Sequence, residues 1–183
     1  EAQEIIETGV GEYAQEILML DHMAKIMRKH RYENGAIEFD RAEVRFEIDE
    51  TGHPIDVYFK VSKDANKLIE EFMLLANRTV AQAIGLPHDK KKAKAFVYRV
   101  HDMPDPGKLA DLSSLSRTFG YKVKADGSAK EVNRSLNRML RDVKGKGEEN
   151  LLSTLALRAM AKAVYTTQNI GHYGLGFEYY THF

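Results

Sequence analysis

The chain has 183 residues, of which 43% are hydrophobic and 30% charged, with 13 glycines and 4 prolines; this composition is typical of one globular domain and excludes a disordered chain. No apolar run approaches the roughly 20 residues of a membrane span, and there is no signal-peptide pattern or cysteine, so we expect a soluble, cytoplasmic protein with no membrane partner. The 27 basic residues equal the 27 acidic ones, which excludes a general attraction for nucleic acid.

Two helices are predicted at the start of the chain, over residues 2–8 and 12–31, with Gly9 and Gly11 between them. Within the longer one, apolar residues recur at steps of three and four, which is typical of one buried face: Tyr13, Ile17, Leu20, Met23, Ala24 and Met27. Asn34 and Gly35 supply a stop signal after it.

Strict alternation of apolar and polar residues then indicates a β-hairpin. Val44, Phe46 and Ile48 precede a turn that contains Gly52, and the alternation resumes at Ile55, Val57, Phe59 and Val61. An apolar sheet face needs a cover, so we expect this one to pack on a helix predicted over residues 65–84.

The rest of the chain predicts a short strand at 95–100, a turn at 104–107 and helices at about 107–119, 128–144 and 148–166, with no regular pattern after Thr167. Lys90 to Lys94 is predicted to be a surface loop. Together the elements predict a helix-rich α+β fold, in which a small antiparallel sheet, the hairpin plus a short strand, packs against several helices.

One predicted helix carries a basic stripe at steps of four, four and three, so its cations share a face: Lys130, Arg134, Arg138 and Arg141. Such a face is either a solvated surface or a phosphate-binding surface. The sequence leaves both open.

Four segments resemble, in family order, the catalytic domain of the ribonuclease II and ribonuclease R family, the RNB domain: GAIEFD (35–40), NKLIEEFMLLANRTVAQ (66–82), YRVHDMPDP (98–106) and LRAMAKAVYTTQNIGHYGLGFEYYTHF (157–183). The resemblance is closer to ribonuclease R. It implies part of a processive 3′-5′ exoribonuclease that hydrolyses single-stranded RNA to nucleoside 5′-monophosphates with Mg²⁺. Residues 1–183 are interpreted as an internal fragment of that domain, with its upstream and downstream parts absent.

The family holds Mg²⁺ through an aspartate cluster that belongs upstream of these segments, and a phosphate-gripping arginine follows the YTHF motif. The closely spaced aspartates of this chain, Asp102 and Asp105, lie in a predicted turn and do not match that cluster. We therefore expect no catalytic and no metal-binding residue here, Mg²⁺ ligands only elsewhere in the parent protein, and an isolated fragment that is inactive without the rest of the parent chain in cis.

Substrate contacts do carry over from the resemblance, with single-stranded RNA as the partner. Phe39 matches a phenylalanine that stacks on a base, and Glu70 matches a glutamate that contacts the terminal nucleotide. His172 and Tyr173 are candidates for lining the RNA channel. The alternatives are a core position for Phe39, a solvated charge at Glu70 and closing aromatic residues that fill the edge of a core.

Arg99 and His101 are predicted to anchor a loop rather than to catalyse. For His182, a structural role and a place in the channel lining are equally open. Two other functions remain open. A degenerate member of the family would be a non-catalytic RNA- or protein-binding module, and a helical interaction domain unrelated to RNA is the third possibility.

Overall fold

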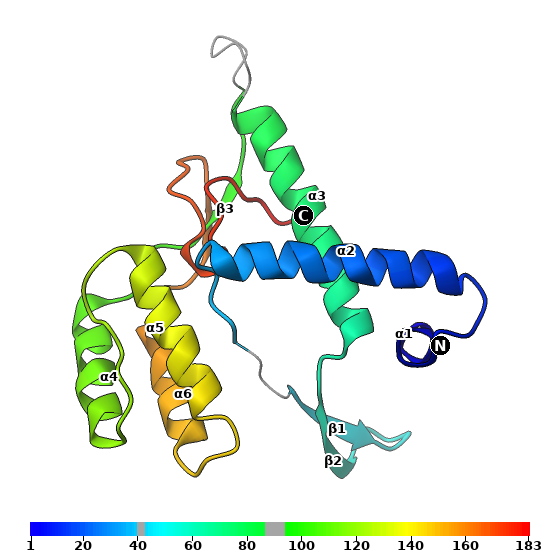
Figure 1. Cartoon of the computed structure of the whole chain (residues 1–183), viewed down its shortest axis with the longest axis horizontal. Coiled ribbons are helices and arrows are strands. Elements are labelled where there is room, and N and C mark those ends of the chain that lie inside the picture. The colour runs from blue at the N-terminus through cyan, green and yellow to red at the C-terminus, as the bar shows by residue number, and fades with distance from the viewer. Residues whose placement is uncertain (40–42, 87–93) are drawn as a thin grey trace. The chain divides into compact units, whose positions relative to one another are not determined.

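The computed structural model describes residues 1–39, 43–86 and 94–183. These residues form two compact units, one of residues 1–27 and 39–72 and the other of residues 28–38 and 73–183. The helices are α1 (Ala2–Thr8), α2 (Ala14–Glu33), α3 (Asp64–Gly85), α4 (Pro106–Thr118), α5 (Ala129–Asp142) and α6 (Glu149–Ala159). The strands are β1 (Glu43–Ile48), β2 (Pro54–Lys60), β3 (Tyr98–Val100) and β4 (Val164–Thr166), and η2 (Tyr173–Leu175) is a 3₁₀ turn (Figure 1). The predicted helix-rich α+β fold is confirmed.

Charged side chains connect two helices within the first unit. Lys25 Nζ lies 2.6 Å from a carboxylate oxygen of Asp21 and 3.2 Å from one of Asp64, which ties α2 to the start of α3. The predicted buried face of residues 12–31 is largely wrong, because Tyr13 is 67% exposed. Ala24 is the one member of the predicted apolar set that the structure classes as buried among the described residues.

The hairpin of β1 and β2 is confirmed, but its predicted cover is not. Val44 pairs with Phe59 and Phe46 with Val57, so these four side chains share one face. Residues 44 to 60 are all exposed, and Phe59 is 68% exposed. The expectation that this face packs on the helix of residues 65–84 is therefore wrong.

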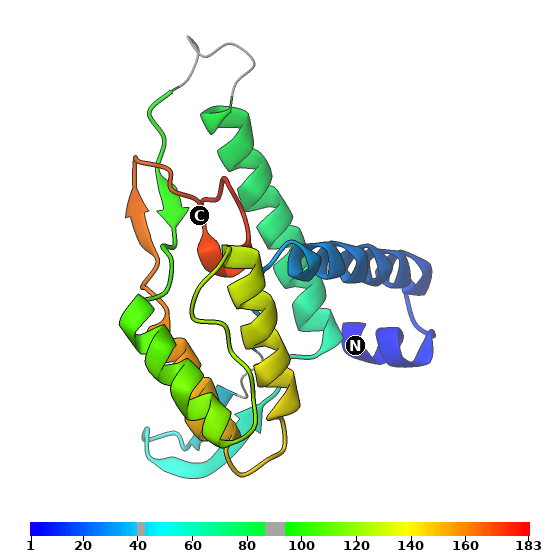
Figure 2. The ribbon, with the colours of Figure 1, turned by 60° about the vertical axis from the view of Figure 1, so that its left-hand side comes forward.

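Three helices build the main core of the second unit, where α4 and α5 pack on α6 (Figures 1 and 2). Asp105 begins α4 by accepting a hydrogen bond from the Lys108 N–H at 3.0 Å, and Ser128 begins α5 in a capping box with Glu131. Between the helices lies a fully buried apolar set: Leu112, Val132, Leu136, Met139, Val143 and Leu152.

The predicted helix over 148–166 ends early, at Ala159. Residues 164–166 form β4 instead and pair antiparallel with β3, so that Arg99 lies opposite Tyr165. The Arg99 guanidinium lies 4.6 Å from the centre of the Tyr165 ring. Val164, Tyr165 and Thr166 have side chains that favour strands, and the cross-strand pair gives them a partner. The short predicted strand thus pairs with β4 and not with the hairpin.

The predicted lysine loop and the predicted lack of a membrane span concern the part of the chain that the structure describes. Of the predicted surface loop, Lys90 to Lys92 lie outside the described residues, and Lys94 is exposed. No helix in the described part of the chain combines the length and apolarity that crossing a membrane requires.

Candidate functional site

The C-terminal segment of residues 171–180, which has no regular pattern in the sequence, is hydrogen-bonded to β3 and the residue after it. The Arg99 N–H donates to the Tyr180 carbonyl at 2.9 Å, and the His101 N–H donates to the Gly171 carbonyl at 3.0 Å. The Tyr173 N–H donates in turn to the His101 carbonyl at 2.8 Å. These bonds place His172 and Tyr173 beside His101.

Both ring nitrogens of His101 are hydrogen-bonded, one to this segment and one to the chain after α6. Nδ1 accepts from the Gly174 N–H at 2.9 Å, and Nε2 lies 2.8 Å from the Ala161 carbonyl oxygen. Because a carbonyl only accepts, Nε2 carries the proton and Nδ1 is free to accept. Burial lowers the pKa of His101. This confirms the prediction that His101 is an anchor for a loop.

His172 and Tyr173 are both held in their neutral forms. Burial, followed by the neighbouring His101, lowers the pKa of His172 to about 4, and His172 Nδ1 accepts from the Leu175 N–H at 3.2 Å. Burial raises the pKa of Tyr173 to about 12. Its hydroxyl is buried with no hydrogen-bond partner among the described residues. The two rings lie 5.1 Å and 6.0 Å from the His101 ring, which makes an uncharged aromatic cluster.

A second segment, residues 35–38, lies between this cluster and α5. The Ile37 N–H donates to the Gly174 carbonyl at 2.8 Å. From the other side, Asn133 Nδ2 donates to the Gly35 carbonyl at 2.6 Å and Asn137 Nδ2 to the Ala36 carbonyl at 2.8 Å. The structure therefore joins the segment at 35–40 to the C-terminal segment, which is also hydrogen-bonded to the segment at 98–106.

The sequence analysis missed Asn133 and Asn137. The available signal was their spacing of four, which puts both on one helix face, in a helix interior where asparagine is unfavourable. Both side chains are buried.

Phe39 and Glu70 belong to the first unit. Phe39 is half-buried and follows Glu38 directly, whereas Glu70 is exposed on α3. Their predicted RNA contacts stay predictions. His172 and Tyr173 belong to the second unit, where both rings lie beside the His101 ring.

The described residues do not fit a Mg²⁺ site. Asp105 caps α4, and Asp102 accepts from the Met103 N–H at 2.7 Å. No group of three or more histidine, aspartate or glutamate side chains among the described residues is arranged to hold a metal ion. No chemical step at a metal can be assigned to this part of the chain.

The basic stripe of α5 is exposed along its whole length. Arg141 lies 3.5 Å from Glu38, and Arg138 lies 3.8 Å from Asp142. The prediction of a cationic face is confirmed, and its role as solvated surface or phosphate contact stays open.

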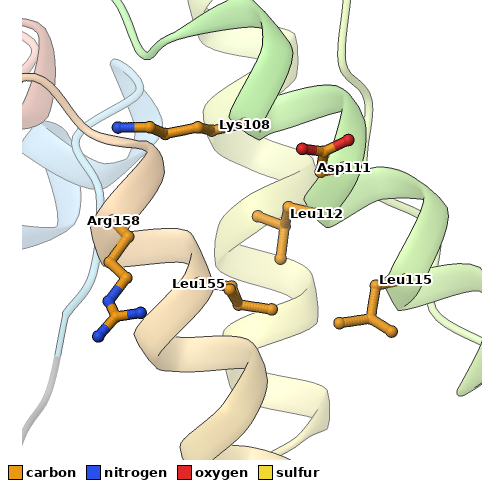
Figure 3. Close-up of a pocket in the computed structure, with 6 residues that line it drawn as sticks. All are labelled: Lys108, Asp111, Leu112, Leu115, Leu155 and Arg158. Atoms are coloured by element: carbon orange, nitrogen blue, oxygen red, sulfur yellow. The ribbon is translucent and has the colours of Figure 1, made fainter.

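A pocket of about 490 Å³ lies between α4 and α6. Figure 3 shows Leu112, Leu115 and Leu155 pointing into a common space, with Lys108, Asp111 and Arg158 around it. Its volume is in the range of small-ligand sites. The four residues predicted to contact RNA are not among those that line it.

The chain matches the RNB domain model over residues 1–183. It is 37% identical over 165 residues to ribonuclease R of Aquifex aeolicus, covering 90% of this chain and 22% of that protein. The Mycoplasma genitalium RNase R solved in complex with ribose methylated single-stranded RNA has a TM-score of 0.79 and 25% identity, over 94% of this chain and 26% of that one. Yeast Ssd1, a pseudonuclease, has a TM-score of 0.65 at 20% identity over 100% of this chain and 22% of that one, which shows the fold alone.

The chain spans about a fifth of the length of the curated relatives it matches. The family model nevertheless covers it from end to end. The chain therefore belongs to the RNB domain family.

Proposed function

We propose that this chain forms part of the RNA channel of a processive 3′-5′ exoribonuclease of the ribonuclease R type, which hydrolyses single-stranded RNA to nucleoside 5′-monophosphates. The observation that carries the proposal is the hydrogen bond from the Ile37 N–H to the Gly174 carbonyl. It holds Ile37, from the AIEF motif, against the GHYGLG motif, and the sequence predicts RNA contacts in both motifs. The identity to ribonuclease R and the RNA-bound relative support the same assignment.

In this proposal Phe39 stacks on a base near the 3′ end, because an aromatic ring offers a face to any base without reading its identity. Glu70, which is exposed, contacts the terminal nucleotide. His172 and Tyr173 line the channel as neutral rings, so they add no charge beside the phosphates.

The reaction itself is assigned to other parts of the complete protein, which supply the Mg²⁺ ligands. The 183-residue chain by itself is then expected to release no nucleotides from RNA. We place the complete protein in the cytoplasm.

The test is Phe39→Ala in the complete protein, with Phe119→Ala as the matched control. Phe119 is an exposed phenylalanine just after α4. Loss of one stacked base at about 1–3 kcal/mol is expected to weaken binding of single-stranded RNA by roughly 5- to 150-fold and to slow trimming from the 3′ end. The control is expected to change neither. Equal binding and trimming by both variants would contradict the RNA role of Phe39.

The second candidate is a non-catalytic RNA- or protein-binding module. The likeness to Ssd1, a pseudonuclease, supports this second candidate, because Ssd1 has the fold without nuclease activity. A complete protein that binds single-stranded RNA but releases no mononucleotides from it would establish this reading. The family match over the whole chain argues against a helical interaction domain unrelated to RNA.

A further inference from the structure

The structure assigns a positioning role to Asn133 and Asn137 of α5. We propose that these two side chains hold residues 35–38 in one extended conformation and thereby fix where Phe39 is presented to RNA. The inference rests on the proposed function, since it takes Phe39 as the residue that stacks on a base.

The Asn137 side chain makes the hydrogen bonds to residues 35–38 that a neighbouring β-strand would make. Its Nδ2 donates to the Ala36 carbonyl at 2.8 Å, and its Oδ1 accepts from the Glu38 N–H at 2.9 Å. A residue of a parallel strand makes the same pair of bonds, one to the residue before its neighbour and one to the residue after it. One carboxamide therefore replaces a β-ladder partner on this side of Ile37.

The bonds on the other sides of the segment complete the restraint. The Ile37 N–H points away from α5 and donates to the Gly174 carbonyl at 2.8 Å. Asn133 Nδ2 donates to the Gly35 carbonyl at 2.6 Å. Gly35 itself has a φ of 98°, which turns the chain out of α2 in a conformation that favours glycine.

Burial makes these bonds effective. Ala36 is 0% exposed and Asn137 is 5% exposed, so water cannot readily replace the hydrogen bonds once they are lost. Both functions of the Asn137 carboxamide are used, one donor and one acceptor. Leucine has nearly the same shape and offers neither, and aspartate keeps the acceptor but loses the donor.

The restraint reaches the predicted RNA contact through a single peptide bond. Glu38 is the last residue held by Asn137, and the Phe39 Cα atom lies about 3.8 Å further along the chain. Rotation about the backbone of residues 36–38 would move the Phe39 ring, and stacking tolerates little displacement.

The test uses a double-mutant cycle in the complete protein. Asn137→Leu, Phe39→Ala and the combination are compared for their affinity for a ribose-methylated single-stranded RNA oligonucleotide. The matched control is Ser113→Ala, since Ser113 Oγ is buried and donates to the Val123 carbonyl at 2.7 Å. That variant loses a buried bond from side chain to backbone in the same unit, away from residues 35–38.

If Asn137 acts by positioning Phe39, Asn137→Leu weakens RNA binding by several-fold and the double variant binds no worse than Phe39→Ala. Ser113→Ala then keeps the affinity of the unchanged protein. Amide hydrogen exchange at Ile37 and Glu38 is expected to accelerate in Asn137→Leu and to stay slow in Ser113→Ala. Should Asn137→Leu not fold, Asn137→Asp replaces it, with the same non-additivity expected.

Two results overturn the inference: an Asn137 variant with unchanged RNA affinity, or a loss that adds in full to that of Phe39→Ala, because a purely structural role would add. A third result would contradict the proposed function of Phe39 and not the role of Asn137. If Phe39→Ala alone leaves RNA binding unchanged, Phe39 does not stack on RNA, and Asn137 has nothing there to position.

Discussion

The Gly174 N–H donates a 2.9 Å hydrogen bond to His101 Nδ1, and a Cβ atom at residue 174 would lie 2.8 Å from that same nitrogen. Any residue except proline could donate this bond, but the close approach requires a residue without a side chain. This pair therefore sets how tightly the C-terminal segment packs against the end of β3.

Gly174→Ala is expected to destabilise the protein by about 1–3 kcal/mol, as overpacking does. The His101 ring also donates to Ala161, so it cannot move aside freely. The free energy of unfolding in urea measures the effect. Gly147→Ala is the control, because a Cβ atom there would meet nothing within 4 Å. Similar losses in both variants would show that His101 does not resist the added methyl group.

The stability of the protein is expected to fall as the pH falls from about 6.5 towards 4. The folded-state pKa of His172 is about 4, below the ordinary value of 6.5, so the unfolded state takes up its proton first. This contribution is fully present above pH 6.5 and is lost as the pH drops through that window. His101 acts in the same direction, because burial also lowers its pKa.

For His172 the expected loss between pH 7 and pH 5 is about 1–2 kcal/mol after allowance for its partial exposure. His172→Asn tests it, since asparagine can still accept the hydrogen bond from the Leu175 N–H. Unfolding free energies at the two pH values should differ less in this variant than in the unchanged protein. An identical difference in the two proteins would mean that His172 titrates normally.

Tyr173→Phe is expected to leave stability unchanged or to raise it by up to about 1 kcal/mol. The Tyr173 hydroxyl is buried without a partner among the described residues, and removing an unpaired buried polar group relieves its desolvation. Tyr180→Phe is the comparison, because the Tyr180 hydroxyl lies 3.1 Å from His182 Nδ1. That variant should lose about 1 kcal/mol. A similar loss in Tyr173→Phe would reveal a partner for the Tyr173 hydroxyl.

The apolar face of the hairpin is expected to drive self-association of the 183-residue chain. Phe46 is 60% exposed and Phe59 is 68% exposed, and large exposed apolar patches seek partners. Phe59→Lys should shift sedimentation towards the monomer. Tyr58→Lys places the same charge on the opposite face of β2 and should shift it less. Equal effects of the two substitutions would exclude the apolar face as the contact.

Local patterns were sufficient for much of this fold. Alternating residues predicted the hairpin, and the helices predicted over residues 65–84 and 128–144 correspond to α3 and α5, because helix and strand patterns arise within a few residues of the chain. The same patterns failed where the outcome depended on a partner. Residues 164–166 leave the predicted helix because β3 offers them a ladder, and the hairpin's apolar face is not covered by the helix that its pattern required.

The sequence by itself determined the helix-rich architecture and, through four segments that resemble the family in family order, the RNB domain. Only the tertiary structure decided which side chains act together. Asn133 meets Gly35 across 98 residues of sequence, Asn137 meets Ala36 across 101, and His101 meets Gly174 across 73. Contacts at such separations, and the burial that keeps His172 neutral, depend on how distant segments pack, and no short-range periodicity encodes that.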